Sequence, residues 1–216
     1  MHSYASDSID RRVAPWGIAI CAVFVAFLYG TLSNKFQFSL PWWCETPSIM
    51  LVYGLFHWVY NSWLWKREIL RFRLSRIPDC NGTWYGKLRS SHHGETEIEG
   101  MLVVHQTWSK IVLEFRTDSS ASYSRMASLN VTPGASAGLI YEYTNDPRAD
   151  AKETMHAHRG FAFLKLSTDG NYLEGDYYTG RDRTNYGTMC LRLVSRKRLD
   201  LQETKSQYSA MAKGAA

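Results

Sequence analysis

The chain has 216 residues, enough for one domain with flanking segments, and a formal net charge of +5. Residues 80–196 hold thirteen basic and thirteen acidic residues, so the surplus charge lies in the flanks. A neutral domain argues against tracking along a nucleic acid, which needs a broad basic face, but it leaves room for a compact anion held by a few arginines. The four cysteines form no C-x-x-C pair, which argues against a zinc site or a disulfide framework.

Two uncharged stretches near the N-terminus predict membrane spans. Residues 1–10 are polar and are expected to be disordered, within a cytoplasmic N-terminal tail at 1–12. The first span is predicted at 13–33 and the second at 46–65, joined by a short periplasmic loop at 34–45. Twenty helical residues rise about 30 Å, the thickness of the hydrocarbon core. Two alternatives stay open: a cleavable signal peptide for the first stretch and an interfacial helix for the second.

Flanking charges predict how these spans are oriented. Arg11 and Arg12 precede the first span, and residues 66–79 form a basic juxtamembrane segment. The positive-inside rule then places both termini and the following domain in the cytoplasm, on a protein of the cell inner membrane. We expect the second helix to continue through 66–76 and to end before Pro78, where the domain boundary lies.

Small and polar residues on the two predicted spans suggest packing surfaces. A stripe of small residues lets helices approach closely, and polar groups at membrane depth usually face protein or water. The residues are Ala22, Ala26 and Gly30 in the first span and Gly54, His57 and Asn61 in the second. Packing within one chain and packing between chains both remain open.

Eight runs of alternating apolar and polar residues occupy 80–196 and predict β-strands. They are Gly82 to Ser90, Glu95 to Gln106, Lys110 to Arg116, Ser119 to Val131, Gly138 to Thr144, His158 to Leu166, and two within Leu173 to Leu193. Glycines inside the runs, at 86, 100, 160 and 175, favour tight curvature. The predicted fold is all-β: an eight-stranded antiparallel up-and-down β-barrel preceded by a two-helix transmembrane hairpin.

Three further features complete the structural prediction. Trp84 is expected in the barrel core. The run from Ser119 to Val131 is ambiguous, with Tyr123, Met126 and Leu129 as its apolar positions. Residues 197–216 are small and polar and are expected to form a disordered tail.

Polar and aromatic residues near strand ends suggest an anion site at one rim of the barrel. Arg181 and Arg183 present planar charged donors suited to phosphate, although loop arginines are often only solvated. Tyr141 and Tyr143 either stack on a base or pack in the core. Asn145 either reads a base edge or caps a turn. His158 either donates to phosphate or is satisfied within its strand.

No motif in the chain indicates an enzyme. The sequence contains no G-x-S-x-G elbow, no P-loop and no H-E-x-x-H. His156 and His158 with His92 and His93 could approach a metal ion, but no carboxylates are placed to complete such a site. We therefore expect neither catalysis nor a metal centre nor a cofactor.

The order of the motifs resembles a known family. The motifs are Gly82-Thr-Trp-Tyr-Gly86, Tyr143-Thr-Asn145-Asp-Pro147, His158-Arg-Gly160, and Leu173-Glu-Gly-Asp-Tyr177-Tyr-Thr-Gly-Arg181 followed by Gly187-Thr188. With two N-terminal spans before them, they resemble the SMODS-associated, STING-like two-transmembrane β-barrel effectors of bacterial CBASS anti-phage defence. The similarity runs from about Arg12 to Arg196.

The resemblance implies a receptor-effector without catalytic residues. Its barrel would bind a cyclic dinucleotide made by a partner nucleotidyltransferase, and binding would drive self-association through the spans, disruption of the inner membrane and abortive-infection cell death. Arg181 and Arg183 would meet the phosphates. The base and sugar contacts would be Tyr143, Asn145, His158 and Thr179.

Two rival functions remain open at this stage. A membrane-tethered lipid- or fatty-acid-binding barrel would have an apolar cavity throughout. A structural membrane adaptor would have a solid barrel. The partners expected under the main reading are the cyclic dinucleotide, the lipid bilayer and further copies of the chain, with no DNA or RNA.

Overall fold

The computed structural model describes residues 1–36, 49–69, 72–91, 96–132, 138–147, 158–180 and 185–213. They fall into two compact units. One unit is Ser8–Pro78, and the other combines Met1–Asp7 with Asp79–Ala216. The chain therefore passes between the units twice, at Asp7–Ser8 and at Pro78–Asp79.

The first unit is built on α1 (Asp10–Phe36) and α2 (Ile49–Ser62), which pack against each other. Among the described residues, α1 is the one helix long and apolar enough to cross a membrane, with a mean hydropathy of 2.0 over its best window. Only 11% of that window is buried, as a lipid-facing helix requires. The described part of α2 has 14 residues, so a hairpin of two spans stays a prediction.

The prediction that the second helix continues through 66–76 is wrong. The helix gives way to a single 3-10 turn, Leu64–Lys66, and then to a hairpin of β3 (Glu68–Ile69) and β4 (Phe72–Arg73). Arg67 already has an extended backbone, with φ −88° and ψ 149°. The alternation of apolar and basic residues across this segment has a period of two, which is the period of a strand.

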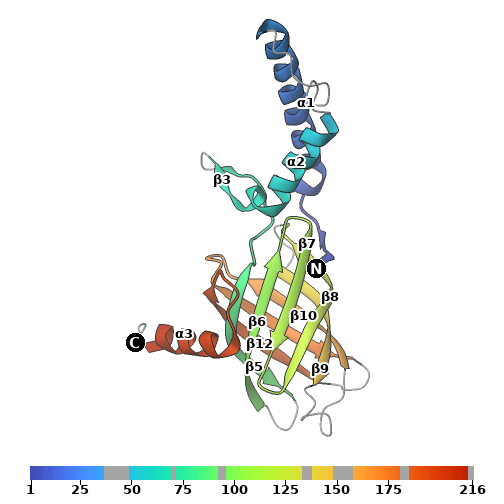
Figure 1. Cartoon of the computed structure of the whole chain (residues 1–216). Coiled ribbons are helices and arrows are strands. Elements are labelled where there is room, and N and C mark those ends of the chain that lie inside the picture. The colour runs from blue at the N-terminus through green and yellow to red at the C-terminus, as the bar shows by residue number, and fades with distance from the viewer. Residues whose placement is uncertain are drawn as a thin grey trace. The chain divides into compact units, whose positions relative to one another are not determined.

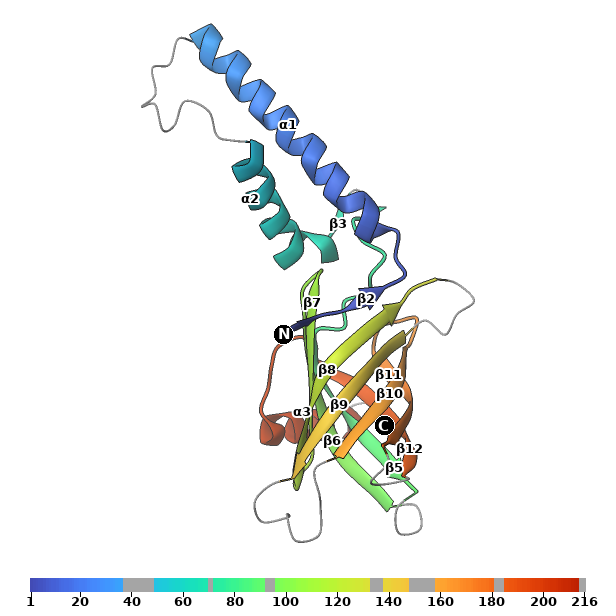
Figure 2. The ribbon, with the colours of Figure 1, turned by 90° about the vertical axis from the view of Figure 1, so that its right-hand side faces the viewer.

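The second unit is a closed barrel of eight antiparallel strands, as predicted (Figure 1). The strands are β5 (Gly82–Ser90), β6 (Thr96–Gln106), β7 (Lys110–Arg116), β8 (Ser120–Asn130), β9 (Gly138–Pro147), β10 (His158–Leu166), β11 (Tyr172–Thr179) and β12 (Tyr186–Ser195). Each strand pairs with the next, and β12 returns to pair with β5 (Figure 2). This is an up-and-down meander.

Large apolar side chains fill the interior of the barrel. Trp84 is completely buried, and its indole N–H donates to the Cys80 carbonyl at 3.0 Å, which confirms its predicted place in the core. Leu102, Leu164 and Leu191 are equally buried on other strands. The period of two holds because one face of each strand packs here while the other faces outward.

A glycine inside the barrel makes room for an aromatic ring. Gly100 lies on β6, and a methyl group there would collide with the Phe115 ring on the neighbouring strand β7. The far end of the Phe115 ring therefore occupies the space beside Gly100, which is possible only without a side chain at that position.

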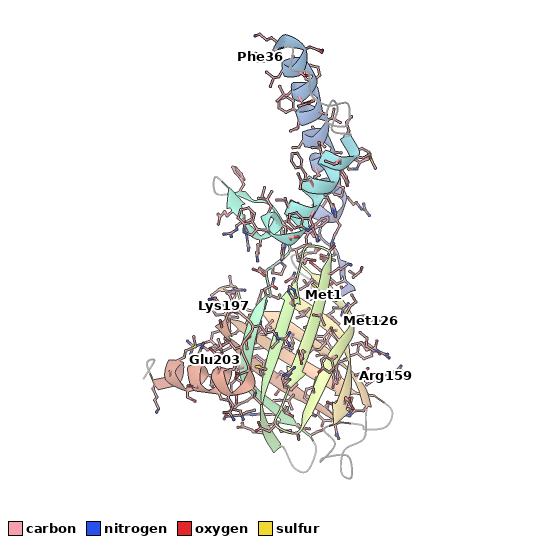
Figure 3. The ribbon with its side chains drawn as sticks, viewed as in Figure 1. Met1, Phe36, Met126, Arg159, Lys197 and Glu203 are labelled. Atoms are coloured by element: carbon pink, nitrogen blue, oxygen red, sulfur yellow. The ribbon has the colours of Figure 1, made fainter. Side chains whose placement is uncertain are left out.

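The ambiguous fourth strand, β8, contains a β-bulge. The pairing of β8 with β9 shifts register between Ser124 and Met126. A bulge adds one residue and reverses which side chains face inward. Tyr123 and Met126 are consequently 46% and 57% exposed, and Met126 projects from the outer wall (Figure 3), whereas Leu129 is buried.

The N-terminal seven residues are part of the barrel, so the prediction that 1–10 is disordered is wrong. β1 (His2–Ser3) pairs with β7, and β2 (Ala5–Ser6) pairs with β8. Tyr4, between them, is 6% exposed, and its hydroxyl donates to the Trp108 carbonyl at 2.9 Å. Helix α1 begins at Asp10, only three residues after Asp7.

The C-terminal segment forms a helix, which corrects the prediction of a disordered tail at 197–216. The helix α3 (Leu201–Lys213) contacts β5 and β12 and projects to the side of the barrel (Figure 1). Asp200 caps it, since its carboxylate accepts the Glu203 N–H at 2.7 Å. Apolar residues of this segment, Leu199, Leu201 and Tyr208, cover a cluster on the outer wall formed by Tyr85, Met101, Val103 and Val194.

We expect Tyr208→Ala to destabilise the barrel. The Tyr208 ring lies 5.0 Å from the Tyr85 ring, centroid to centroid, and its loss would expose the outer cluster. Loss of a partly buried aromatic side chain costs about 1–3 kcal/mol, which would lower the melting temperature by several degrees. Thermal unfolding followed by circular dichroism checks this, with Gln202→Ala on the exposed face of α3 as the control. An unchanged melting temperature would show that α3 adds no stability.

Candidate functional site

The described candidate residues gather at one end of the barrel. We call this end the mouth: β5, β7, β9 and β11 end there, and β6, β8, β10 and β12 begin there. In the sheet register Asn145 is opposite His158, and Gly160 lies between Tyr143 and Thr179. The closed sheet thus brings residues from three strands together. Arg181 and Arg183 lie outside the described residues.

Tyr143 is packed at the floor of the mouth. It is 6% exposed, and its ring meets the His158 ring edge-on at 6.4 Å. The neighbouring Gly160 has no side chain, and a methyl group there would collide with the Tyr143 ring. Burial raises the pKa of the Tyr143 hydroxyl, and proximity to Tyr177 adds to the shift. Tyr143 is therefore a neutral ring on the boundary between core and mouth.

Tyr141 lies one step deeper on the same strand. It is 3% exposed, and its ring centroid is 6.1 Å from that of Tyr143. Burial raises the pKa of its hydroxyl as well. Of the two roles considered for Tyr141, packing in the core is the one that its position supports.

Asn145 is a strand residue rather than the cap of a turn, because β9 continues to Pro147. It is 4% exposed, and its side-chain oxygen accepts a hydrogen bond from the Ser122 hydroxyl at 2.9 Å. Because the bond engages the amide oxygen, the two amide N–H donors are the groups suited to an acceptor on a ligand. Ser122 fixes the orientation of this amide.

Thr179 holds the two ends of the segment that carries the arginines. Its backbone N–H and its hydroxyl both donate to the Asn185 carbonyl, at 2.9 and 3.0 Å. The Asn185 N–H donates back to the Thr179 hydroxyl at 2.9 Å. Gly180 N–H also donates to the carbonyl of Arg159, labelled in Figure 3, at 2.6 Å. The structure therefore gives the Thr179 hydroxyl a positioning role.

Sequence reasoning missed Ser122, Ser90 and Tyr177 as residues of the mouth. Tyr177 is 6% exposed and hydrogen-bonded to the Ser90 side chain, and a methyl group at Gly187 would come within 2.5 Å of its ring. The alternation of Leu173, Gly175 and Tyr177 already placed this ring inside the barrel. Ser122 was hidden because its strand contains the bulge.

A groove of about 640 Å³ lies beside the mouth. It is lined by Arg89, Ser90, Ser91, Asp176, Tyr178, Tyr186, Gly187 and Thr188. The Arg89 side chain donates to the Glu97 carboxylate at 2.9 Å, so its charge is already paired. Tyr178 and Tyr186 are 50% and 62% exposed and provide aromatic surface at this rim.

The described residues contain no group of three or more side chains that could hold a metal ion. The histidines considered for such a site, His92, His93 and His156, lie outside the part of the chain that the structure describes. His158 lies at the mouth beside Tyr143.

Comparison with known proteins decides the family. The model of the family described as Cap15, cyclic dinucleotide receptor domain, matches residues 75–193, which is more than half of the chain. The chain belongs to this family. The match covers every strand of the barrel except the last residues of β12, and it includes the mouth. The resemblance drawn from the sequence motifs is thereby confirmed.

Two curated relatives carry the name CD-NTase-associated protein 15. The protein from Yersinia aleksiciae is 33% identical over 141 residues, which are 65% of this chain and 66% of that protein. The protein from Escherichia albertii is 26% identical over 86 residues, which are 39% of this chain and 44% of that protein. The alignments thus cover slightly less than two thirds and less than half of the relatives.

The buried tyrosines predict a loss of stability at alkaline pH. The folded-state pKa of Tyr143 is raised, so above the unfolded-state value of about 10 the unfolded chain loses a proton that the folded barrel retains. The stabilising contribution is complete below pH 10 and is lost as the pH rises through the folded-state value. Each such group steepens the fall by at most about 1.4 kcal/mol per pH unit.

Urea unfolding between pH 8 and 11 tests this effect. The Tyr143→Phe variant should lose stability less steeply above pH 10 than the unmodified protein. Tyr186→Phe, at an exposed position of the rim, is the matched control and should follow the unmodified protein. Identical slopes for Tyr143→Phe and the unmodified chain would contradict the burial argument.

Proposed function

We propose that the barrel binds a cyclic dinucleotide at its mouth and that the whole chain is a membrane-anchored effector of CBASS anti-phage defence. The observation that carries this proposal is the match of residues 75–193 to a cyclic dinucleotide receptor domain, since this range contains the mouth. The names of both relatives associate them with CD-NTases, which supports a nucleotidyltransferase as the source of the ligand. The role is that of a receptor, without catalysis and without a cofactor.

The chemistry of the mouth suits such a ligand. A cyclic dinucleotide has two phosphates, two ribose groups and two bases. Tyr143 and His158 present aromatic rings for a base, and Asn145 presents amide donors for an acceptor on the base edge. Arg181 and Arg183 supply the phosphate donors, on a segment whose two ends Thr179 and Asn185 hold together.

The packed interior argues against the rival function of lipid binding. A bound acyl chain would need the space that Trp84, Leu102 and Leu164 occupy, all at most 1% exposed. The ligand instead rests on the layer formed by Tyr141 and Tyr143, where the interior changes from apolar to polar. This layer makes the mouth a shallow site rather than a deep cavity.

In the proposed effector, the membrane helices carry out the response to ligand binding. Helix α1 has 27 residues and a length of about 40 Å, which exceeds the hydrocarbon core. We propose that the stretch predicted at 46–65 is a second span, with both termini and the barrel in the cytoplasm. Ligand binding then drives oligomerisation, the helices disrupt the inner membrane, and the infected cell dies. Clustering of barrels would raise the local concentration of the helices.

We expect Arg181→Ala and Arg183→Ala to weaken cyclic dinucleotide binding. A hydrogen bond to a charged group contributes about 1.5–3 kcal/mol, so each change should cost about 10- to 100-fold in affinity. Isothermal titration of the full chain in detergent with cyclic di-AMP, di-GMP and di-UMP measures this. Arg125→Ala, on the outer wall, is the control. Unchanged affinity in both variants would remove these arginines from the site, and absence of binding to a broad panel would refute the receptor function.

The natural cysteines test the proposed topology. Cys190 is exposed on the barrel wall, whereas Cys80 is buried and its thiol pKa is raised to about 12 by burial. A membrane-impermeant maleimide at pH 8 should leave Cys190 unlabelled in spheroplasts and label it after lysis. Cys190→Ser is the control that identifies the labelled site. Labelling of Cys190 in intact spheroplasts would place the barrel outside the membrane and contradict the proposal.

A further inference from the structure

The first seven residues, Met1–Asp7, form a segment that we call the heptad. It lies where the barrel wall has its shortest direct strand pairing, between β7 and β8. Strands β7 and β8 pair directly at three positions near the mouth, from Glu114↔Tyr123 to Arg116↔Ala121. Farther from the mouth the heptad pairs with both strands, through β1 on β7 and β2 on β8. It therefore supplies backbone partners to edges that would otherwise be unpaired.

Polar side chains at both ends of the heptad form hydrogen bonds with β8 or with the residues directly after it. His2 Nε2 is hydrogen-bonded to the Ser124 hydroxyl at 2.8 Å, and the same hydroxyl accepts the Leu113 N–H at 2.9 Å. The Asp7 carboxylate accepts the N–H groups of Val131 and Thr132, at 2.7 and 3.1 Å. Ser124 thus joins β7, β8 and the heptad at one point.

The same region of β8 reaches the mouth. Ser122, two residues before Ser124, donates to the side chain of Asn145. The bulge between Ser124 and Met126 follows directly. A bulge is a place where a strand can change its twist and register without loss of the flanking ladder. A movement of Asn145 is thereby passed to Ser124 and to His2 through one short stretch of backbone.

The other end of the heptad is joined covalently to the apolar helix. Asp7 is followed by Ser8 and Ile9, and α1 begins at Asp10. Within each unit, hydrogen bonds link the chain near Pro78–Asp79, the second connection between the units, to the chain near Asp7–Ser8, the first connection. In the barrel unit, the buried Gln106 accepts the Cys80 N–H at 2.8 Å and donates to the Tyr4 hydroxyl at 3.3 Å.

In the helical unit, the carboxylate of Asp10 performs the equivalent role. It accepts the Ser75 hydroxyl at 2.8 Å and the Arg76 N–H at 2.5 Å, shortly before the chain passes back to the barrel unit. Both covalent passages are therefore bound to each other at both of their ends.

We propose that Met1–Asp7 is a coupling strap, which joins the mouth to the first membrane helix through Asn145, Ser122, Ser124 and His2. The strap closes the barrel wall, and a change at the mouth alters how tightly it is held. Ser124 acts as a positioning residue in this path and does not itself touch the ligand. The ligand-dependent part rests on the proposed function, whereas the coupling between mouth and strap is a property of the chain itself.

Hydrogen–deuterium exchange of the full chain in detergent tests the coupling without ligand. The Ser122→Ala variant, altered only at the mouth, should speed exchange of amides 2–6 by about fivefold, the factor expected from losing one hydrogen bond. Asp7→Asn, altered only at the strap, should speed exchange of amides 143–146, since coupling is reciprocal. Ser209→Ala on α3 is the control. Unchanged exchange of amides 2–6 in Ser122→Ala would overturn the proposal.

A second exchange measurement is made with ligand. Cyclic di-AMP, di-GMP and di-UMP are first tested for binding, and the one that binds is added. Ligand should change the exchange of amides 2–6 in the unmodified chain by at least about threefold. In Ser124→Ala the affinity, measured by titration calorimetry, should stay within about threefold while the change at amides 2–6 disappears. An equal response of the strap in Ser124→Ala would overturn the path through Ser124. Absence of any binding would refute the receptor function. The coupling between mouth and strap would then be decided by the exchange of Ser122→Ala and Asp7→Asn without ligand.

Discussion

Closure of the sheet is the constraint on which the rest of the molecule depends. The meander from β5 to β12 has two outer strands in its pairing order, β7 and β8, and their short direct pairing turns the sheet into a barrel. Closure gives every strand an inner face, on which the core packs, and it lines up the strand ends at the mouth. The bond between Ser122 and Asn145 and the contact between Tyr143 and His158 join neighbouring strands of this wall, β8 to β9 and β9 to β10, close to their ends at the mouth.

The barrel is completed by parts of the chain that lie outside its eight strands. The heptad Met1–Asp7 pairs along the closing strands, and the segment from Leu199 to Tyr208 covers apolar residues on the outer wall. The second unit therefore begins at Met1, is interrupted by the helical unit, and resumes at Asp79. A domain boundary drawn at 80–196 separates the strands from both of these supports.

Local alternation was sufficient to predict the eight strands, the core position of Trp84 and the place of Tyr143, Asn145 and His158 at strand ends. It failed where a distant partner decides the structure. The heptad is polar and becomes ordered only through β7 and β8, and α3 has few apolar residues, whose partners Tyr85 and Met101 lie far away in sequence. The bulge in β8 reverses which positions face inward, which is why this run was ambiguous in the sequence and Ser122 was overlooked. The positions of Arg181 and Arg183 and the second span remain predictions.

Three rings in this barrel lie against glycines on adjacent strands: Phe115 on Gly100, Tyr143 on Gly160 and Tyr177 on Gly187. In each pair the flat ring occupies the volume that a side chain on the partner would need. At Gly160 and Gly187 a methyl group would also collide with a backbone carbonyl oxygen of an adjacent strand, so exchanging the ring alone would not make room for a side chain there. These two glycines lie at the mouth, so divergence in ligand preference within the family is expected to leave them unchanged and to fall on the side chains around them.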